Sequence, residues 1–179
     1  MKTAQFFFNQ LKGQKGGRRW ALAFFLGVLG AGAMAPVHAV FLLTPAIMGL
    51  MWLTFDSSRA RGAFAIGWWF GLGHFSTGFY WVANALFVYP DRFGWMAPLA
   101  VFALAGLMAL FPAVSVVASR AFGRRSSAVG RVLVFAAVWV FFEWVRSWMF
   151  TGFPWNLTGS IWTFSDAMIQ SVALAGVYG

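Results

Sequence analysis

Long apolar runs, separated by short basic or polar segments, set the pattern of this chain. Five runs approach the ~20 residues that a helix needs to cross the hydrocarbon core of a bilayer, and they cover residues 20–35, 38–55, 62–88, 94–118 and 132–150. A further apolar segment begins near Ala167, with Asp166 as its expected N-cap, and runs to Gly179. The pattern predicts an all-α polytopic transmembrane helix bundle with five full spans and the truncated start of a sixth.

The boundary between the first two runs lies at Pro36. Both runs are short for complete spans, so a single broken helix is the alternative to two helices. Basic residues precede the first run, and Arg59 and Arg61 follow the second. Both groups therefore share one side of the membrane only if the chain crosses twice and turns at residues 35–38. Cleavage of a signal peptide near Val37 is disfavoured, because it would leave the two arginines without a preceding crossing.

The same reasoning assigns a side of the membrane to every loop. Eleven of the 13 Lys and Arg residues then lie on one side, and Arg92 stays in the outer loops, which is the positive-inside pattern. We expect residues 1–19 to form a cytoplasmic basic N-terminus and residues 20–179 to form the transmembrane helical domain.

Composition supports a membrane protein and excludes several other classes. Hydrophobic residues make up 61% of the 179 residues and charged residues 9%, against roughly 25% charged in a soluble domain. The absence of Cys excludes a disulfide scaffold and any zinc site or nucleophile that needs a thiolate. The net charge of +9 does not indicate a nucleic-acid partner, because the basic residues form short clusters between apolar runs rather than one continuous soluble face.

Glu143 and Arg146 are charged residues inside the fifth apolar run, and their i, i+3 spacing puts them on one helix face. An ionisable side chain in the bilayer costs roughly 2.5–3.5 kcal/mol on insertion scales, so such a residue is a functional candidate. Two interpretations stay open. Either the pair neutralises itself and fixes helix packing, or Arg146 faces a cavity and binds a phosphate or carboxylate.

Small and polar residues follow two adjacent faces of the third run. One face carries Gly67, Gly71, His74 and Gly78, and the other carries Gly73, Thr77, Tyr80 and Asn84. Both stripes predict a helix buried in the bundle, since small residues let helices approach closely. We interpret His74 as a hydrogen-bonded packing residue rather than a proton relay or ligand, because no second His or carboxylate lies at metal-binding spacing. Pro112 is expected to kink the fourth run.

The segment after the fifth run, residues 151–162, is rich in aromatic residues but too broken by Gly and Pro for a helix. An aromatic belt at the membrane interface accounts for Trp148 and Trp162. It accounts less well for residues 153–155, Phe-Pro-Trp, which we interpret as a rigid wall for an acyl chain or a protein partner. The glycosylation triplet at residues 156–158 is treated as a chance match. The four acids lie too far apart in this topology to form a catalytic constellation.

Several segments, taken in order, resemble the membrane domain of bacterial apolipoprotein N-acyltransferases. The clearest looks like the family's helix that ends in E-x-x-R-x-W, here Glu143, Arg146 and Trp148, followed by T-G-F-P-W, here residues 151–155. Weaker matches occur at Ala35-Pro36 and at residues 71–75, 78–81 and 176–179. The resemblance extends over nearly the whole chain.

The resemblance implies an acyltransferase of the bacterial inner membrane, with a cytoplasmic N-terminus and with loop 151–165 on the periplasmic side. In this family a nitrilase-like domain carries a Glu–Lys–Cys triad. The triad takes an acyl chain from a membrane phospholipid as a thioester and passes it to the diacylglyceryl-cysteine that begins an apolipoprotein. This chain has no Cys and ends before that domain would begin, so we expect it to hold no catalytic residue and to be inactive alone. The resemblance implies no cofactor and no metal.

The resemblance also suggests residues that border the entry of lipid. We expect Glu143 to hold Arg146 in place and the lipid- or substrate-binding set to be Arg146, Trp148, Phe153, Pro154 and Trp155. Structural support is expected from His74, Gly71 and Gly78. One alternative is a fragment of a secondary transporter or channel with an intramembrane Glu/Arg/His path, although the sequence shows no internal repeat. Another is a purely structural scaffold.

Overall fold

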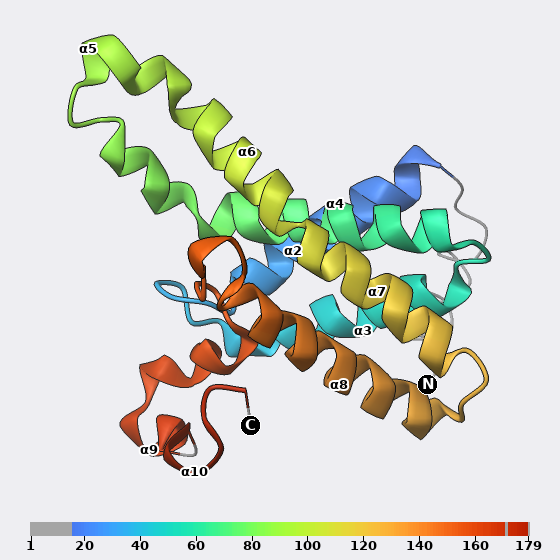
Figure 1. Ribbon diagram of the computed structural model, residues 1–179. Helices are drawn as coiled ribbons and strands as arrows, with labels where there is room; N and C mark the ends of the chain where they lie inside the picture. Colours follow the sequence, from blue (N-terminus) through green and yellow to red (C-terminus); the bar gives the residue numbers. More distant parts are fainter. Residues whose placement is uncertain (1–15, 171, 179) are drawn as a thin grey trace.

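The computed structural model describes residues 16–170 and 172–178, and this part of the chain consists of helices and connecting loops (Figure 1). The α-helices are α2 (Gly17–Ala31), α3 (Leu43–Asp56), α4 (Ala60–Gly78), α5 (Pro90–Phe93), α6 (Ala97–Met108), α7 (Leu110–Gly123), α8 (Ala128–Arg146), α9 (Asp166–Ile169) and α10 (Val172–Ala175). The 3₁₀ helices are η1 (Val40–Leu42), η2 (Tyr80–Ala85), η3 (Gly94–Met96), η4 (Met149–Thr151) and η5 (Thr158–Phe164). No strand occurs in the two described ranges, which confirms the predicted all-α class. The lysines of the predicted basic N-terminus, Lys2, Lys12 and Lys15, lie outside these ranges.

Helix α4 lies at the centre of the bundle. It packs against α2, α6 and α7, and α8 packs against α7. In Figure 1 the starts of α2, α4 and α8 gather with the ends of α3 and α7 at the right-hand end of the bundle. The turn at residues 32–39, the segment from η2 to α5 and residues 147–165 lie toward the opposite end. The candidate site lies at this second end.

Two helical stretches are long and apolar enough to cross a membrane, Pro90–Gly123 and Ala128–Arg146. They contain most of the fourth and fifth predicted runs. The helix Val40–Asp56 is also apolar but is shorter. The third run departs from its prediction, because α4 ends at Gly78 and the chain continues in the 3₁₀ turns of η2. A single unbroken span up to residue 88 is therefore wrong.

The turn at Pro36 separates two helices, α2 and α3, and does not merely break one helix. Hydrogen bonds from His38 N to Met34 O (2.9 Å) and from Ala39 N to Gly32 O (3.0 Å) close the turn. Helices α2 and α3 then pack side by side (Figure 1). The prediction that the chain divides into two helices at this proline is confirmed.

The stretch Pro90–Gly123 is interrupted at Ala109, between α6 and α7. Pro112 has no N–H to donate to the carbonyl of Met108, and its ring crowds that carbonyl. The regular helical hydrogen bonding is therefore lost one turn before the proline. The fourth run is thus interrupted one turn before Pro112, at Ala109, where the backbone keeps helical dihedral angles; the kink itself stays a prediction.

The last segment of the chain differs from its prediction in two details. Helix α9 begins at Asp166 itself, and its N-cap is Ser165, so the assignment of Asp166 as N-cap is wrong. Asp166 instead occupies the first turn, where a negative charge is favourable beside the exposed backbone N–H groups. Residues 158–162, part of the segment predicted to be non-helical, belong to the 3₁₀ helix η5 (Thr158–Phe164).

Glycines on α2 and α4 let these two helices touch backbone to backbone. A Cβ atom added at Gly27 would overlap the carbonyl oxygen of Phe70, and one added at Gly73 would overlap the carbonyl oxygen of Phe24. Of the second polar stripe of the third run, Gly73 faces α2, whereas Thr77 is exposed, and Tyr80 and Asn84 are exposed in η2 beyond the end of α4. Close approach of this kind strengthens dispersion contacts between helices that share an apolar environment.

The first stripe of α4 faces α7 in the same way. A Cβ atom at Gly67 would lie 2.6 Å from the Cα of Ala113, and one at Gly71 would lie 2.8 Å from the Cα of Ala109. Gly71 thus supports the bundle and not the candidate site. The predicted close packing is confirmed at Gly67, Gly71 and Gly73, and the predicted burial is wrong for the polar side chains of the second stripe, which are exposed.

Substituting Gly73→Ala tests the backbone contact between α2 and α4. We expect a loss of about 1–3 kcal/mol of stability, because the added methyl group forces the helices apart. The loss is measured as a lower thermal midpoint of the purified protein in detergent micelles. Gly106→Ala is the matched control, since its Cβ would lie 3.6 Å from the Trp68 ring, an ordinary contact. Equal midpoints for the two variants would contradict the close approach.

Candidate functional site

The site is built from the last turns of α8 and the irregular chain that follows. Ser127 caps the start of α8 by accepting a hydrogen bond from Gly130 N (3.2 Å), and an apolar sequence carries the helix to Arg146. Glu143 and Arg146 are both buried, with exposed fractions of 8% and 2%. Two ionisable side chains buried at the end of an apolar helix need polar partners, and the following loop supplies them.

Arg146 binds the backbone of the loop. Its Nη1 donates to the carbonyl oxygens of Phe153 (3.1 Å) and Trp155 (2.6 Å). Phe153 N donates in return to the carbonyl oxygen of Arg146 (3.2 Å). The guanidinium also lies over the ring of Phe75 on α4, 5.0 Å from its centroid, which adds a cation–π contact. Arg146 therefore fixes both the path of the loop and its distance from α4.

Glu143 holds the other end of the same loop segment. Its Oε1 accepts hydrogen bonds from Thr158 N (2.9 Å) and from Thr158 Oγ1 (2.8 Å). Trp139, one turn earlier on α8, donates from its Nε1 to Thr158 Oγ1 (3.0 Å). We call Glu143, Arg146, Thr158 and the carbonyl groups of Phe153 and Trp155 the loop anchor.

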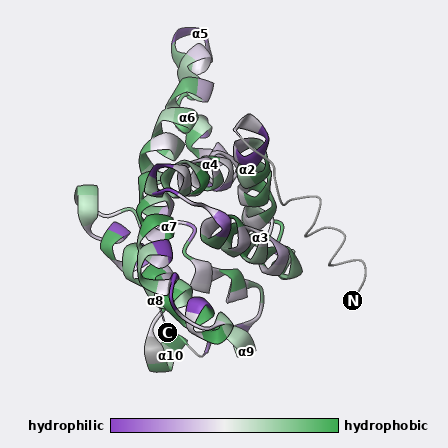
Figure 2. Cartoon of the chain, turned by 90° about the vertical axis from the view of Figure 1, so that its right-hand side faces the viewer, coloured by the Kyte–Doolittle hydropathy of each residue, from purple (hydrophilic) through white to green (hydrophobic). Residues whose placement is uncertain are grey.

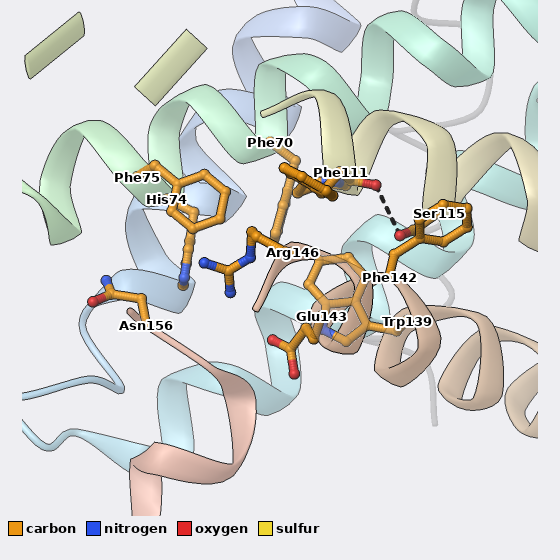
Figure 3. Close-up of a pocket in the computed structure, with 11 residues that line it drawn as sticks. Phe70, His74, Phe75, Phe111, Ser115, Trp139, Phe142, Glu143, Arg146 and Asn156 are labelled. Carbon is orange, nitrogen blue, oxygen red and sulfur yellow. Dashed lines mark hydrogen bonds between the residues drawn. The ribbon is translucent and has the colours of Figure 1, made fainter. Parts of the chain in front are cut away.

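The expectation that Glu143 directly holds Arg146 is not what the structure shows. Among the described residues an ion pair occurs between Arg19 and Asp56 (3.0 Å) but none joins Glu143 to Arg146. Figure 3 shows the guanidinium of Arg146 directed toward His74 and Asn156, with the carboxylate of Glu143 lying apart from it. Each charge instead takes backbone partners from the loop, so the two side chains cooperate through the segment that they both bind.

Positive φ angles give the loop its shape. Phe150 and Asn156 have φ angles of 53°, and Gly152 has a φ of 83°. A Cβ atom at Gly152 would also lie 2.6 Å from the carbonyl oxygen of Ser147. Gly152 is therefore required where the chain leaves α8 and turns back toward it.

A small cavity lies beside the loop anchor, between α4, α7 and α8. Its volume is about 20 Å³, and its lining includes His74, Glu143, Arg146 and Asn156 (Figure 3). His74 stacks on Phe70 at 6.2 Å between ring centroids. The stacking agrees with the interpretation of His74 as a packing residue, but its Nδ1 is buried without a hydrogen-bond partner among the described residues, so the predicted hydrogen bonding is not shown at that atom. A cavity of this size holds about one water molecule and excludes a larger ligand.

Asn156 connects the loop to α4. Its amide group packs against Gly78, where an added Cβ would overlap the amide nitrogen. Gly78 thus serves the site by making room for Asn156. The residue triplet that looked like a chance glycosylation signal supplies both Asn156, on the cavity, and Thr158, in the loop anchor.

The aromatic residues of the loop divide into inward and outward groups. Phe153 points inward and meets the ring of Phe79 edge-on, at 5.1 Å. Pro154 is exposed, and Trp155 is 53% exposed, with its ring 5.1 Å from that of Trp81. The loop therefore presents a rigid aromatic surface at this end of the bundle.

Trp148 belongs to a different part of that surface. It is 56% exposed and meets Trp144 of α8 edge-on, at 5.7 Å. The predicted set is thus brought together only in part: Arg146 contacts the backbone of Phe153 and Trp155, while Trp148 pairs along the helix. Sequence reasoning missed Trp139, Thr158 and Phe75, because no periodic pattern indicates which loop atoms return to a helix.

The described part of the chain contains no group of three or more His, Cys, Asp or Glu side chains that could hold a metal ion. Of the four acids, Glu143 alone lines the cavity at the site. The arrangement can position a loop and present an apolar surface.

Comparison of the sequence with known proteins identifies the family of this chain. The sequence profile described as "Apolipoprotein N-acyltransferase N-terminal domain" matches residues 26–179. The chain is similar to proteins named apolipoprotein N-acyltransferase from Rickettsia bellii (41% identity over 157 residues), Allorhizobium ampelinum (39% over 173 residues) and Brucella melitensis (38% over 174 residues). These matches cover 86%, 92% and 91% of this chain but 30%, 32% and 32% of the relatives, so the chain spans about a third of their length. The chain belongs to the apolipoprotein N-acyltransferase N-terminal domain family.

Proposed function

We propose that this chain is the membrane part of a bacterial apolipoprotein N-acyltransferase, and that its aromatic loop borders the path by which lipid reaches the active site. The loop anchor carries the proposal. It holds residues 153–158 against α8 with backbone hydrogen bonds, which leaves Pro154 and Trp155 at the surface. A rigid apolar edge of this kind suits an acyl chain, because the loop is already ordered and loses little conformational entropy when the acyl chain binds.

The reaction moves an acyl chain from a membrane phospholipid to the N-terminal amine of an apolipoprotein's diacylglyceryl-cysteine. A thiolate attacks the ester carbonyl of the phospholipid, the lysophospholipid leaves, and the amine then attacks the thioester and releases the thiolate. These 179 residues contain no Cys, so the nucleophile belongs to a part of the enzyme outside them. The present chain binds and orients the lipid: Trp148, Pro154 and Trp155 border its entry, and the buried Arg146 and the inward-facing Phe153 hold that surface in place.

The distribution of basic residues supports a defined orientation in the inner membrane. The arginines of α2, α4, α7 and α8, other than Arg146, lie at or near the right-hand end of the bundle in Figure 1, while Arg92 lies in α5 at the opposite end. By the positive-inside rule the first end is cytoplasmic and loop 151–165 is periplasmic. Helices α2, α3, α4, α6 with α7, and α8 are then the five spans.

A transporter path through Glu143, Arg146 and His74 finds no support. Both charges are engaged by the loop, and the cavity among these side chains has a volume of only about 20 Å³. The relatives reported above are named as acyltransferases.

Substituting Trp155→Ala in the full-length enzyme tests the role of the loop surface. Arg146 binds the backbone carbonyl of residue 155, so the loop anchor stays intact when the indole is removed. We expect acyl transfer to a diacylglyceryl lipopeptide to fall roughly tenfold, the effect of losing about 1.5 kcal/mol of apolar contact with the acyl chain. Product is measured by mass spectrometry. Trp95→Ala, an indole 69% exposed in η3, is the control, and equal rates for both variants would refute the proposal.

Two substitutions of Glu143 distinguish the loop anchor from an ion pair. Glu143→Gln keeps an Oε1 acceptor for Thr158, whereas Glu143→Leu leaves the Thr158 N–H without its partner. We expect Glu143→Leu to cost about 1–3 kcal/mol and Glu143→Gln clearly less, as judged by thermal midpoints in detergent. If charge pairing with Arg146 were the main role of Glu143, both variants would lose the same amount.

A further inference from the structure

A polar pocket lies at the end of the bundle opposite the aromatic loop. Its volume is about 220 Å³. We call it the basic pocket. Its lining comes from the end of α3 and the turn that follows it, the end of α7 and the residue after it, and the start of α8: Phe55, Asp56, Ser57, Ser58, Arg120, Arg124 and Arg131. Figure 2 faces this end of the molecule and shows hydrophilic positions at the ends of these helices.

Positive charge in the basic pocket exceeds what its own acid balances. Asp56, the acid in the lining, is paired with Arg19 of α2 at 3.0 Å. Arg120 is fixed in place by donating to the carbonyl oxygens of Ser57 (2.7 Å) and Ser58 (2.6 Å), which are neutral groups. Three arginines line the pocket, and its one acid is already paired with Arg19, so the lining has a net positive charge.

The guanidinium of Arg131 has N–H donors that are not fully hydrogen-bonded. Its Nη2 makes a long contact of 3.5 Å to the carbonyl oxygen of Arg124, and its Nε is buried with no hydrogen-bond partner among the described residues. The guanidinium is positioned over the ring of Phe55, 5.3 Å from its centroid. A guanidinium that is oriented but incompletely hydrogen-bonded is suited to a phosphate oxygen.

An apolar groove begins where the basic pocket ends. The groove lies between α3 and α8, has a volume of about 460 Å³, and is lined by Leu43, Thr44, Ile47, Met48, Met51, Val132, Phe135, Ala136, Trp139, Val140 and Thr158. We call it the α3–α8 groove. Met51 lies one turn before Phe55 on α3, and Phe135 lies one turn after Arg131 on α8, so pocket and groove share the same helix faces. Along α8 the groove extends for about 12 Å, at roughly 1.5 Å per residue from Val132 to Val140.

We propose that the basic pocket and the α3–α8 groove together form a binding site for an anionic phospholipid. The phosphate lies among Arg120, Arg124 and Arg131, and one acyl chain follows the groove toward Thr158. The site rests on the proposed membrane orientation, which puts the pocket at the level of cytoplasmic headgroups. It is separate from the donor lipid at the aromatic loop and takes no part in acyl transfer. Basic pockets between transmembrane helices on this side of a membrane are suited to anionic headgroups.

The headgroup half of the site is tested with the full-length protein in detergent. Binding of phosphatidylglycerol and of phosphatidylcholine is titrated by native mass spectrometry. We expect a preference for phosphatidylglycerol that the double substitution Arg124→Gln and Arg131→Gln reduces about 30-fold, the loss expected for two headgroup-contacting arginines. Arg92→Gln, at the opposite end of the bundle, is the control and keeps the preference. Equal affinity of the double variant and the unchanged protein would overturn the proposal.

The part of the site that binds the acyl chain is tested by filling the α3–α8 groove. Met48 is 64% exposed in the groove, so Met48→Trp occupies the space with little effect on the core. We expect weaker binding of long-chain phosphatidylglycerol and unchanged binding of a dihexanoyl analogue. Leu99→Trp, at a position on α6 that is also 64% exposed, is the control.

Three results would overturn the lipid assignment. Displacement of the phospholipid by millimolar inorganic phosphate would identify a site for free phosphate. Unchanged binding by Met48→Trp would show that no acyl chain uses the groove. Absence of lipid from the full-length protein would show that another part of that protein covers the groove. Acyl transfer by the Arg124→Gln, Arg131→Gln variant separates the two proposals, because we expect its rate to be unchanged even where lipid binding is lost.

Discussion

Two buried charges of opposite sign, one turn apart on α8, fix the position of the aromatic loop. In an apolar environment each charge needs hydrogen bonds, and the loop backbone supplies carbonyl oxygens to Arg146 and an N–H group to Glu143. Moving the loop would leave both ionised side chains without partners. The same bonds satisfy backbone groups of an irregular segment, which is the condition for such a segment to lie against an apolar helix bundle.

The helix bundle provides a rigid surface, chiefly helix α4, against which the loop packs. Helix α4 contacts α2 and α7 through glycines, so its position is set by backbone atoms rather than by flexible side chains. From that helix Phe75 meets the guanidinium of Arg146, and Gly78 leaves the space that Asn156 fills. The glycines of the third apolar run and the charged pair of the fifth thus belong to one arrangement. In the sequence, the glycine spacing of the third run and the charged pair of the fifth run look like two unrelated features.

The sequence predicted what depends on local rules. Pro36 and Pro112 each restrict the backbone near their own position, so the division into α2 and α3 and the break at Ala109 could be anticipated. Helical periodicity likewise indicated the glycine contacts of α4 at Gly67, Gly71 and Gly73, but not the exposure of Thr77. The partners of Glu143 could not be found this way, since the path of the loop depends on positive φ angles at Phe150, Gly152 and Asn156 and brings back a residue fifteen positions away. The end of α4 at Gly78 was missed too, because an apolar sequence continues through the 3₁₀ turns of η2.

Arg146 binds backbone carbonyl oxygens at positions 153 and 155, so these hydrogen bonds do not depend on which side chains stand there. The frame of the loop is consequently independent of the groups displayed on it. The outward-facing side chains can therefore be exchanged without loss of the hydrogen bonds that hold the loop. Under the proposal that lipid passes this loop, substitutions at Pro154 and Trp155 would change the surface offered to the lipid while the helices beneath it keep their packing.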